Sequence, residues 1–206
     1  PLLRTTHRHM IEYIKGEIVE LQPALMIMEC GGVGYELNIS LTTYSTFDGL
    51  REGKIYVHEV IREDAHLLYG FASREERELF LLLTSVSGVG PNTARMILSS
   101  FKPSDLIDII ASGDDATLTT VKGIGNKTAQ RIVVDLKSKV RPVAGLDERR
   151  AAASRGSQTD TSEEAVAALV MLGFQKNASQ KAVEKLLKED PNMPVEQIVR
   201  SALKVL

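Results

Sequence analysis

Residues 86–94 of the chain read VSGVGPNTA, and residues 121–129 read VKGIGNKTA. Both segments fit the pattern Val-x-Gly-[Val/Ile]-Gly-x-x-Thr-Ala, at a separation of 35 positions. A match at so many positions does not arise twice by chance, so we interpret the two segments as an internal repeat. In each copy a tight glycine turn, Gly88 to Gly90 or Gly123 to Gly125, opens directly into a predicted helix.

The glycine turns are expected to bind anions. Glycine permits unusual backbone angles and the close approach of a ligand, and the first turn of a helix exposes N–H groups at the positive end of the helix dipole. Two such sites in one domain would suit two phosphates along a nucleic-acid strand. Contacts of this kind carry no information about the bases.

The repeat has two other possible interpretations. A Gly-x-Gly turn before a helix can be only a corner between helices, although the duplication and the Lys127-Thr128 pair favour a binding role. The segment GIGNKT also resembles a truncated phosphate-binding loop of nucleotide hydrolases. That interpretation fails because Asn126 precedes the lysine, the loop is too short and no buried strand leads into it.

The segment before the repeat is rich in Ile, Val and Tyr and is divided by turn signals such as Gly31-Gly32-Val33-Gly34. The pattern predicts five short strands, at 11–20, 24–30, 35–39, 54–62 and 66–71. Five strands of this length predict a small barrel of the OB-fold type. Ser73 and Glu76 have the spacing of a helix capping box, so we expect a helical domain over residues 73–141.

The segment after the repeat divides into a linker and a small module. Residues 142–160 contain no aromatic residue and hardly any large apolar one, so they cannot offset their chain entropy by burial. Thr161 and Glu164 repeat the capping-box spacing, with Gly173 and Pro191 as later stop signals, and three helices are predicted at 162–172, 178–189 and 194–206. The expected fold class is therefore α+β multidomain: a barrel (10–72), a helical domain (73–141), a linker (142–160) and a three-helix module (161–206).

The net charge of −2 hides an uneven distribution. Residues 10–71 carry 4 Lys or Arg against 10 Asp or Glu, whereas residues 72–141 carry 10 against 8. Within the second segment, residues 121–141 hold six basic residues and one acid. A polyanion would thus be attracted to one part of the chain and repelled by another.

Composition also indicates the compartment. The longest apolar runs fall far short of the roughly 20 residues that a membrane span needs, and no secretory signal is visible. A single cysteine, Cys30, excludes an internal disulfide framework and suits a reducing cytoplasm. Residues 1–9 precede Met10, which looks like a natural start, so we interpret them as an appended or disordered leader.

No arrangement of residues indicates catalysis, a metal site or a cofactor. His58 and His66 lack the spacing of metal ligands or of a nucleophile with its base. The turn REDA at 62–65 places two acids, Glu63 and Asp64, between two predicted strands, and taken alone it is an ordinary solvated turn. An enzyme that binds magnesium at this pair remains an alternative, although it would need further ligands.

The paired repeat resembles the helix-hairpin-helix element of sequence-nonspecific DNA-binding proteins. Together with GGVGYEL (31–37), REDAHLLYGF (62–71) and EAVAALVMLGF (164–174), its position after a five-stranded barrel resembles the RuvA family of bacterial Holliday-junction branch-migration proteins. The resemblance implies a noncatalytic homotetramer, single or doubled to an octamer, that holds a four-way DNA junction open during recombination and DNA repair. A general helix-hairpin-helix repair subunit or nuclease accessory remains the other alternative.

The resemblance also assigns roles to residues. The predicted contacts to the DNA backbone are Gly88, Val89, Gly90, Asn92, Thr93, Lys122, Gly123, Gly125, Asn126, Lys127, Thr128 and Arg131. Glu63 and Asp64 become an acidic pin at the junction centre. Positions 92 and 126 are Asn where the family often has lysine, so the first turn relies on backbone N–H groups and an amide. Lys122 and Arg131 are expected to compensate.

The last module is expected to bind a partner. A small module on a flexible tether commonly captures another protein, and MLGF at 171–174 resembles the loop of ubiquitin-associated domains. The family implies the hexameric ATPase motor RuvB as the partner, and the junction resolvase RuvC is a further candidate. The residues predicted to contact the motor are Leu169, Leu172, Phe174 and Leu203, although each of them could serve only the core of the module.

Overall fold

The computed structural model describes residues 10–141, 143–144, 158–191 and 193–203. The chain divides into two compact units at residue 147. The predicted leader, residues 1–9, and most of the predicted linker, residues 142 and 145–157, lie outside the described residues. No helix in the described ranges has both the length and the apolar character needed to cross a membrane.

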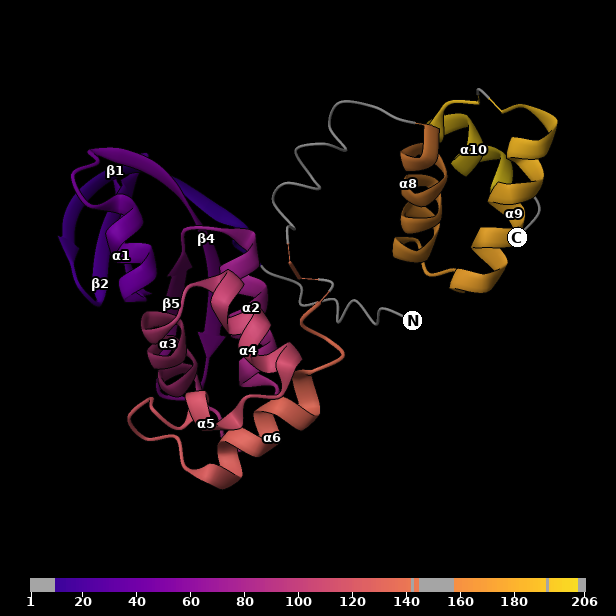
Figure 1. Cartoon of the computed structure of the whole chain (residues 1–206). Helices are drawn as coiled ribbons and strands as arrows, with labels where there is room; N and C mark the ends of the chain where they lie inside the picture. Colours follow the sequence, from indigo (N-terminus) through magenta and orange to yellow (C-terminus); the bar gives the residue numbers. More distant parts are fainter. Residues whose placement is uncertain (1–9, 142, 145–157, 192, 204–206) are drawn as a thin grey trace. The chain divides into compact units, whose positions relative to one another are not determined.

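Five strands form a closed barrel in the first unit (Figure 1), as the sequence predicts. They are β1 (Tyr13–Gln22), β2 (Leu25–Cys30), β3 (Val33–Ile39), β4 (Glu52–Ile61) and β5 (His66–Phe71). Their order around the barrel is β1-β2-β3-β5-β4, and every neighbouring pair is antiparallel except β3 with β5. Met26, Met28 and Leu37 are completely buried inside it, as the two-residue period of a strand requires.

The pairing of β1 with β4 sets residues of the same type opposite each other. Residues 13–17 read YIKGE and residues 52–56 read EGKIY, and the antiparallel register matches them position by position. A Cβ atom on Gly16 would lie 1.9 Å from the carbonyl oxygen of Glu29, and one on Gly53 would lie 2.6 Å from the ring of Phe47. The two facing glycines therefore allow a close approach that no other residue would permit.

A helix that is absent from the sequence prediction, α1 (Leu41–Phe47), joins β3 to β4. The segment is rich in Ser and Thr, which have weak helix propensity, so its helical form depends on contacts with the rest of the fold. The Ser40 side chain caps the helix by accepting the Thr43 N–H. The Thr42 hydroxyl donates to the carbonyl of Leu98 at 2.7 Å, which ties the helix to the helical domain.

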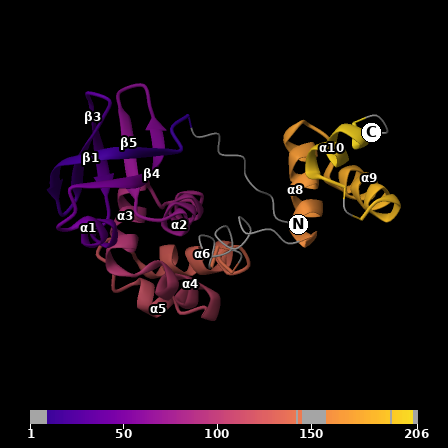
Figure 2. The same cartoon turned by 90° about the horizontal axis from the view of Figure 1, so that it is seen from above.

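The helical domain begins with the predicted cap. Ser73 accepts the N–H of Glu76 at 3.0 Å and starts α2 (Arg74–Thr84). The helices that follow are α3 (Pro91–Ser100), α4 (Pro103–Ser112), α5 (Asp115–Leu118) and α6 (Asn126–Leu136). In Figure 2 the barrel strands lie on one side and α2, α4, α5 and α6 on the other.

The helices share a hydrophobic cluster with strand β5, and the interior of the barrel forms a second cluster. The ring of Phe80 in α2 lies 5.0 Å from the rings of both Tyr69 and Phe71 in β5, measured between centroids. All three residues belong to the same buried cluster as the apolar faces of α3, α4 and α6. The first unit is therefore one packed body, in which the strands cannot move independently of the helices.

Glu76 is a buried carboxylate between α1 and α2. Its oxygens accept hydrogen bonds from the hydroxyls of Ser40 and Thr43 and from the N–H of Ala72. Burial raises the pKa of Glu76, and these hydrogen bonds oppose the rise only in part. The glutamate of the capping box thus holds α1 against the start of α2.

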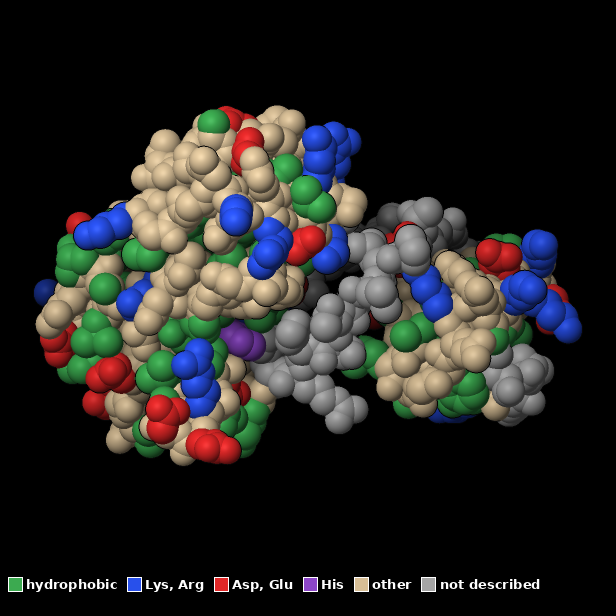
Figure 3. All heavy atoms as spheres, turned by 90° about the horizontal axis from the view of Figure 1, so that it is seen from below, with side chains coloured by type: hydrophobic (Ala, Val, Ile, Leu, Met, Phe, Trp, Pro, Cys, Tyr) green, Lys and Arg blue, Asp and Glu red, His purple; other side chains and the backbone are tan. Residues whose placement is uncertain are grey.

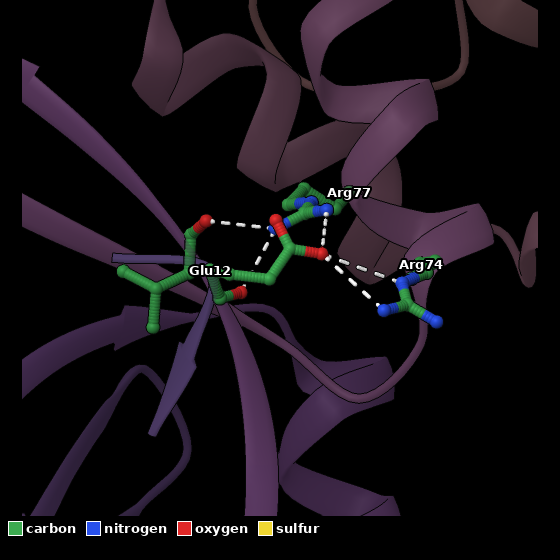
Figure 4. A network of polar contacts seen from close by, with 4 residues as sticks. Glu12, Arg74 and Arg77 are labelled. Atoms are coloured by element: carbon green, nitrogen blue, oxygen red, sulfur yellow. Dashed lines mark hydrogen bonds and ion pairs between the residues drawn. The ribbon is translucent and has the colours of Figure 1, made fainter. Parts of the chain in front are cut away.

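Arg77 ties α2 to the start of β1 (Figure 4). Its Nη1 donates to the backbone oxygens of Glu12 and Val57 at 2.9 and 3.2 Å, and its Nη2 donates to the Glu12 carboxylate at 2.9 Å. Arg74 forms a longer ion pair, 3.4 Å, with the same carboxylate. Partial burial raises the pKa of Glu12, but the hydrogen bonds and charges of Arg77 and Arg74 outweigh it, so the pKa lies below its ordinary value.

The second unit is a three-helix module made of α8 (Gln158–Met171), α9 (Lys176–Glu189) and α10 (Val195–Ala202). The predicted capping position is wrong, because α8 already begins at Gln158 and Thr161 lies inside it. Residues 158–160 contain neither glycine nor proline, so they can extend the helix into what the sequence predicts as linker. The core of the module contains Ala165, Leu169, Val183, Ile198 and Ala202.

We predict that the Glu12 carboxylate stabilises the fold in a pH-dependent way. Because its folded-state pKa lies below the ordinary value of 4.5, its contribution is complete above pH 4.5 and is lost as the pH falls through the folded-state pKa. Wild type should exceed Glu12→Gln in free energy of unfolding by up to about 1 kcal/mol at neutral pH. The value is limited by solvent screening, since the Glu12 side chain is 43% exposed.

Urea unfolding at a series of pH values measures this difference. The matched control is Glu36→Gln, which changes an exposed carboxylate on β3 and should leave the stability unchanged at every pH. A wild-type advantage over Glu12→Gln that stays constant well below pH 4.5 would contradict the prediction.

Candidate nucleic-acid interface

The two copies of the repeat have the same backbone conformation. Gly88 and Gly123 have φ values of +91° and +88°, a region that residues with a side chain rarely adopt. Gly90 and Gly125 are the N-cap residues of α3 and α6, and both have φ of −86°. Each copy therefore makes a tight turn and then starts a helix, as the sequence predicts.

Core and surface positions alternate identically in the two copies. The apolar positions of the pattern are all buried: Val86, Val89 and Ala94 in the first copy, and Val121, Ile124 and Ala129 in the second. The N–H of Val89 also donates to the carbonyl of Val86 at 3.0 Å. Val89, a predicted DNA contact, thus has neither an exposed side chain nor a free donor, and it supports the turn instead. The other predicted contacts are exposed, apart from the half-buried Thr93 and Thr128.

The start of each helix offers unused backbone donors. Within the described residues, no carbonyl accepts the N–H groups of Asn92 and Thr93 at the start of α3, or those of Asn126 and Lys127 at the start of α6. Pro91 has no N–H to offer, so the first site has one donor position fewer. These groups lie at the positive end of the helix dipole, where an anion is stabilised.

The N-cap glycines distinguish a binding site from a simple corner between helices. A Cβ atom on Gly90 or Gly125 would meet no atom within 4 Å, and a φ of −86° is open to any residue. Nothing inside the fold therefore requires glycine at these two positions. The missing side chains do leave room for a phosphate to approach the exposed N–H groups.

The basic side chains belong to the second copy. It holds three exposed cations, Lys122, Lys127 and Arg131. Arg131 also reaches the first copy, where its Nη1 donates to the carbonyl of Ser87 at 3.0 Å. The positions of the first copy equivalent to these three are uncharged: Ser87, Asn92 and Met96. The second turn therefore carries more exposed positive charge than the first.

The acidic pair lies at the tip of a β-hairpin. Residues 62–65 join β4 to β5 and are closed by a hydrogen bond from the Arg62 N–H to the Ala65 carbonyl at 2.8 Å. Glu63 and Asp64 are exposed and form no hydrogen bond or ion pair with any residue that the structure describes. We call this pair the acidic tip. Across the described ranges, no three His, Cys, Asp or Glu side chains come together as a metal site would require.

The acidic tip and the first glycine turn lie at the same end of the first unit. Arg77 contacts Val57 near the start of α2, and Phe80 contacts His58 further along, with ring centroids 5.8 Å apart. The helix therefore follows β4 in the same direction, and both elements end on the side where α5 and α6 lie (Figure 1). Figure 3, seen from below, shows basic side chains over one part of this unit and acidic ones over another.

Three of the predicted motor-binding residues, Leu169, Leu172 and Phe174, flank the corner at Gly173, whose φ of +102° ends α8 as the sequence predicts. The fourth, Leu203, is the C-cap of α10. Leu172 and Leu203 are 59% and 44% exposed, and Phe174 is half-buried against the core. Leu169 is completely buried. Leu169 therefore packs in the core of the module in this fold.

Two exposed apolar side chains at this corner are missing from the sequence prediction. Val170 and Met171 are 41% and 81% exposed. The sequence feature from which their exposure could be predicted is the unbroken apolar run from residue 169 to residue 172. Such a run is too wide for one buried helix face. We call Val170, Met171 and Leu172 the apolar corner.

A closed barrel packed against two helix-hairpin-helix turns defines a class of proteins that bind the nucleic-acid backbone without reading bases. Three family models match the chain: RuvA N terminal domain over residues 10–70, SAM-like helix-hairpin-helix tandem over 80–138, and RuvA C-terminal domain over 160–206. The chain belongs to the RuvA family.

Relatives from several bacteria are similar over nearly the whole chain. A protein of Parabacteroides distasonis is 66% identical over 199 residues, and one of Bacteroides thetaiotaomicron is 52% identical over 201. A protein of Christiangramia forsetii is 50% identical over 198 residues. Each match covers 96% of this chain and the whole of the relative, and each relative is named Holliday junction branch migration complex subunit RuvA.

We predict that the two turns contribute unequally to DNA binding. Each phosphate neutralised by a lysine adds about 0.9 to the slope of log affinity against log salt concentration. Lys127→Gln should therefore lower the slope on duplex DNA by about 0.9, and Asn92→Lys should raise it by about the same amount. Asn92→Gln, which adds no charge, is the control and should leave the slope unchanged. Fluorescence anisotropy over a salt series measures the slopes, and equal slopes in all four proteins would contradict the prediction.

Proposed function

We propose that this chain binds four-way DNA junctions and holds them open, as the non-ATPase, DNA-binding subunit of a branch-migration complex. The observation that carries the proposal is the presence of opposite charges at one end of one packed body: phosphate-binding turns and the acidic tip. The relatives named as subunits of the Holliday junction branch migration complex support the same function.

The glycine turns would hold the duplex arms by their phosphates. Free N–H groups at two helix starts bind phosphate oxygens, and Lys122 and Lys127 add positive charge. Because these contacts do not read bases, any DNA sequence can occupy the site and move through it. Branch migration requires this property, since the base pairs at the junction change at every step.

The acidic tip would act where the strands cross. A homotetramer with a fourfold axis, as the family resemblance implies, would bring four copies of Glu63 and Asp64 together near the axis. Carboxylates and phosphates repel, and the repulsion remains effective within a Debye length of about 8 Å at physiological salt. The crossover then stays free of tight contacts while the arms are held, so strands can pass between arms. A second tetramer on the other face of the junction would give an octamer.

The three-helix module would recruit the motor. The apolar corner and Leu203 place large apolar side chains in solvent, and grouped exposure of this kind marks a protein–protein contact. We assign this surface to the ATPase motor RuvB and expect the resolvase RuvC as a further partner of the assembled complex. The complex would act on DNA in the bacterial cytoplasm.

We predict that Glu63→Gln with Asp64→Asn tightens junction binding by about three- to tenfold at low salt, because the repulsion at the crossover is removed. Affinity for linear duplex should stay the same, and the rate of branch migration should change. The control is Glu17→Gln with Glu52→Gln, which removes two exposed carboxylates that face each other on β1 and β4. Gel shifts on junction and duplex across a salt series measure the affinities.

Junction binding and migration that both remain like wild type in the hairpin variant would contradict the role of the acidic tip. Equal wild-type affinity for junction and duplex would instead favour a general repair subunit.

We predict that Met171→Asp with Leu172→Asp abolishes stimulation of the RuvB ATPase, because a charge placed in an apolar contact is costly to bury. Junction binding should remain within about twofold of wild type, since these residues lie in the other compact unit. Asn177→Asp, an exposed change on α9, is the control. ATPase assays with junction DNA measure the effect, and a loss of junction binding in the corner variant would count against the assignment.

A further inference from the structure

We infer that Arg77 is a positioning residue: it fixes α2 along β4 and so sets the distance between the acidic tip and the first glycine turn. The inference deepens the proposed function and rests on it, because the tip and the turn are the two parts that Arg77 aligns.

Arg77 binds the backbone of both neighbouring strand segments as well as a carboxylate. Its Nη1 lies 2.9 Å from the backbone oxygen of Glu12 and 3.2 Å from that of Val57. The N–H of Val57 itself donates to the same Glu12 oxygen at 3.2 Å. The guanidinium thus continues the hydrogen bonding between β1 and β4 into α2, as Figure 4 shows. The side chain is only 5% exposed, so water competes little for these bonds.

Arg77 lies in the first turns of α2, and Val57 lies in the middle of β4. From Val57, β4 continues to the acidic tip, and from Arg77, α2 continues to the first glycine turn. A helix advances about 1.5 Å per residue, so a slip of α2 by one residue would move the turn by that distance relative to the tip. Hydrogen bonds to a phosphate vary by only a few tenths of an ångström around about 2.9 Å. A slip of one residue would therefore misplace the donors.

Arg77 also keeps a buried donor unpaired. Its Nε is the one buried side-chain nitrogen or oxygen that lacks a hydrogen-bond partner among the described residues. An unsatisfied buried donor lowers stability, so stability alone does not explain arginine here. A lysine could still pair with the Glu12 carboxylate, but its single ammonium group cannot reproduce the planar fork that joins the carboxylate to two carbonyls.

Arg74 provides a matched comparison on the same helix. It pairs with the same Glu12 carboxylate, but at 3.4 Å and with a side chain that is 25% exposed. The Ser73 cap starts α2 without either arginine, and the hydrogen bonds of Glu76 hold this end of the helix against α1 and not against β4. We therefore expect proteins with substitutions at Arg74 or Arg77 to fold.

The test measures the distance from tip to turn in the full chain without DNA. Spin labels at Asp64→Cys and Asn92→Cys, in a Cys30→Ser background diluted with unlabelled protein, report this distance by pulsed electron paramagnetic resonance. Arg77→Lys should shift or broaden the distribution by about 1.5 Å or more, the rise of one helical residue. Arg74→Lys should leave it unchanged. Arg77→Met, an apolar replacement suited to a buried site, is the second variant and should change the distribution further.

An unchanged distribution in both Arg77 variants overturns the inference, and so does a failure of both to fold, since Arg77 would then serve only stability. The functional consequence is measured separately. The ratio of junction to duplex affinity should fall about threefold in Arg77→Lys and stay constant in Arg74→Lys. A changed distance with an unchanged ratio overturns the role of Arg77 in selectivity. If wild type itself shows no preference for junctions, the proposed function fails, while the distances still decide whether Arg77 positions the turn.

Discussion

The packing of α2 along β4 is the constraint on which the rest of the first unit depends. Phe80 places one ring against Tyr69, Phe71 and His58, so a single aromatic cluster belongs to the barrel and to the helices at once. Strand and helix then run in the same direction and end on the same side. Two features of opposite chemistry, an acidic hairpin and a phosphate-binding turn, therefore keep a fixed separation, which two domains joined by a flexible linker could not maintain.

The proposed site is a surface of opposed charges. Helix starts with free N–H groups favour phosphates, and the two carboxylates of the acidic tip, at the same end of the first unit as the first turn, disfavour them. Neither feature depends on a base sequence, so the proposed surface would discriminate by the shape of the nucleic acid and by where its phosphates lie. The uneven charge of the sequence, acidic in the barrel and basic around the second turn, is thus part of the function and not a property of composition alone.

Features with a local cause could be predicted from the sequence. Gly88 and Gly123 mark turns because the backbone there needs positive φ, and Ser73 marks a helix start because its side chain caps it. The strands follow from alternation. The helix α1 was not predicted, because its Thr-rich segment has weak helix propensity and is supported by a contact with α3.

Features that depend on contacts between residues far apart in the chain could not be predicted from the sequence either. Arg77 and Glu12 meet across 65 positions, and no local pattern reveals the pair. Burial at the end of α8 is another example, because the apolar run did not show that Leu169 faces inward while Met171 faces solvent.

The central claim is that the acidic tip lies at the strand crossover while the glycine turns hold the arms. Photo-crosslinking tests it directly: a benzophenone probe on Asp64→Cys, in a Cys30→Ser background, is bound to a junction whose crossover is fixed by its sequence. The account predicts crosslinks to the nucleotides at the crossover, while the same probe on Lys127→Cys marks the arms. Crosslinks from position 64 to the arms alone would contradict it.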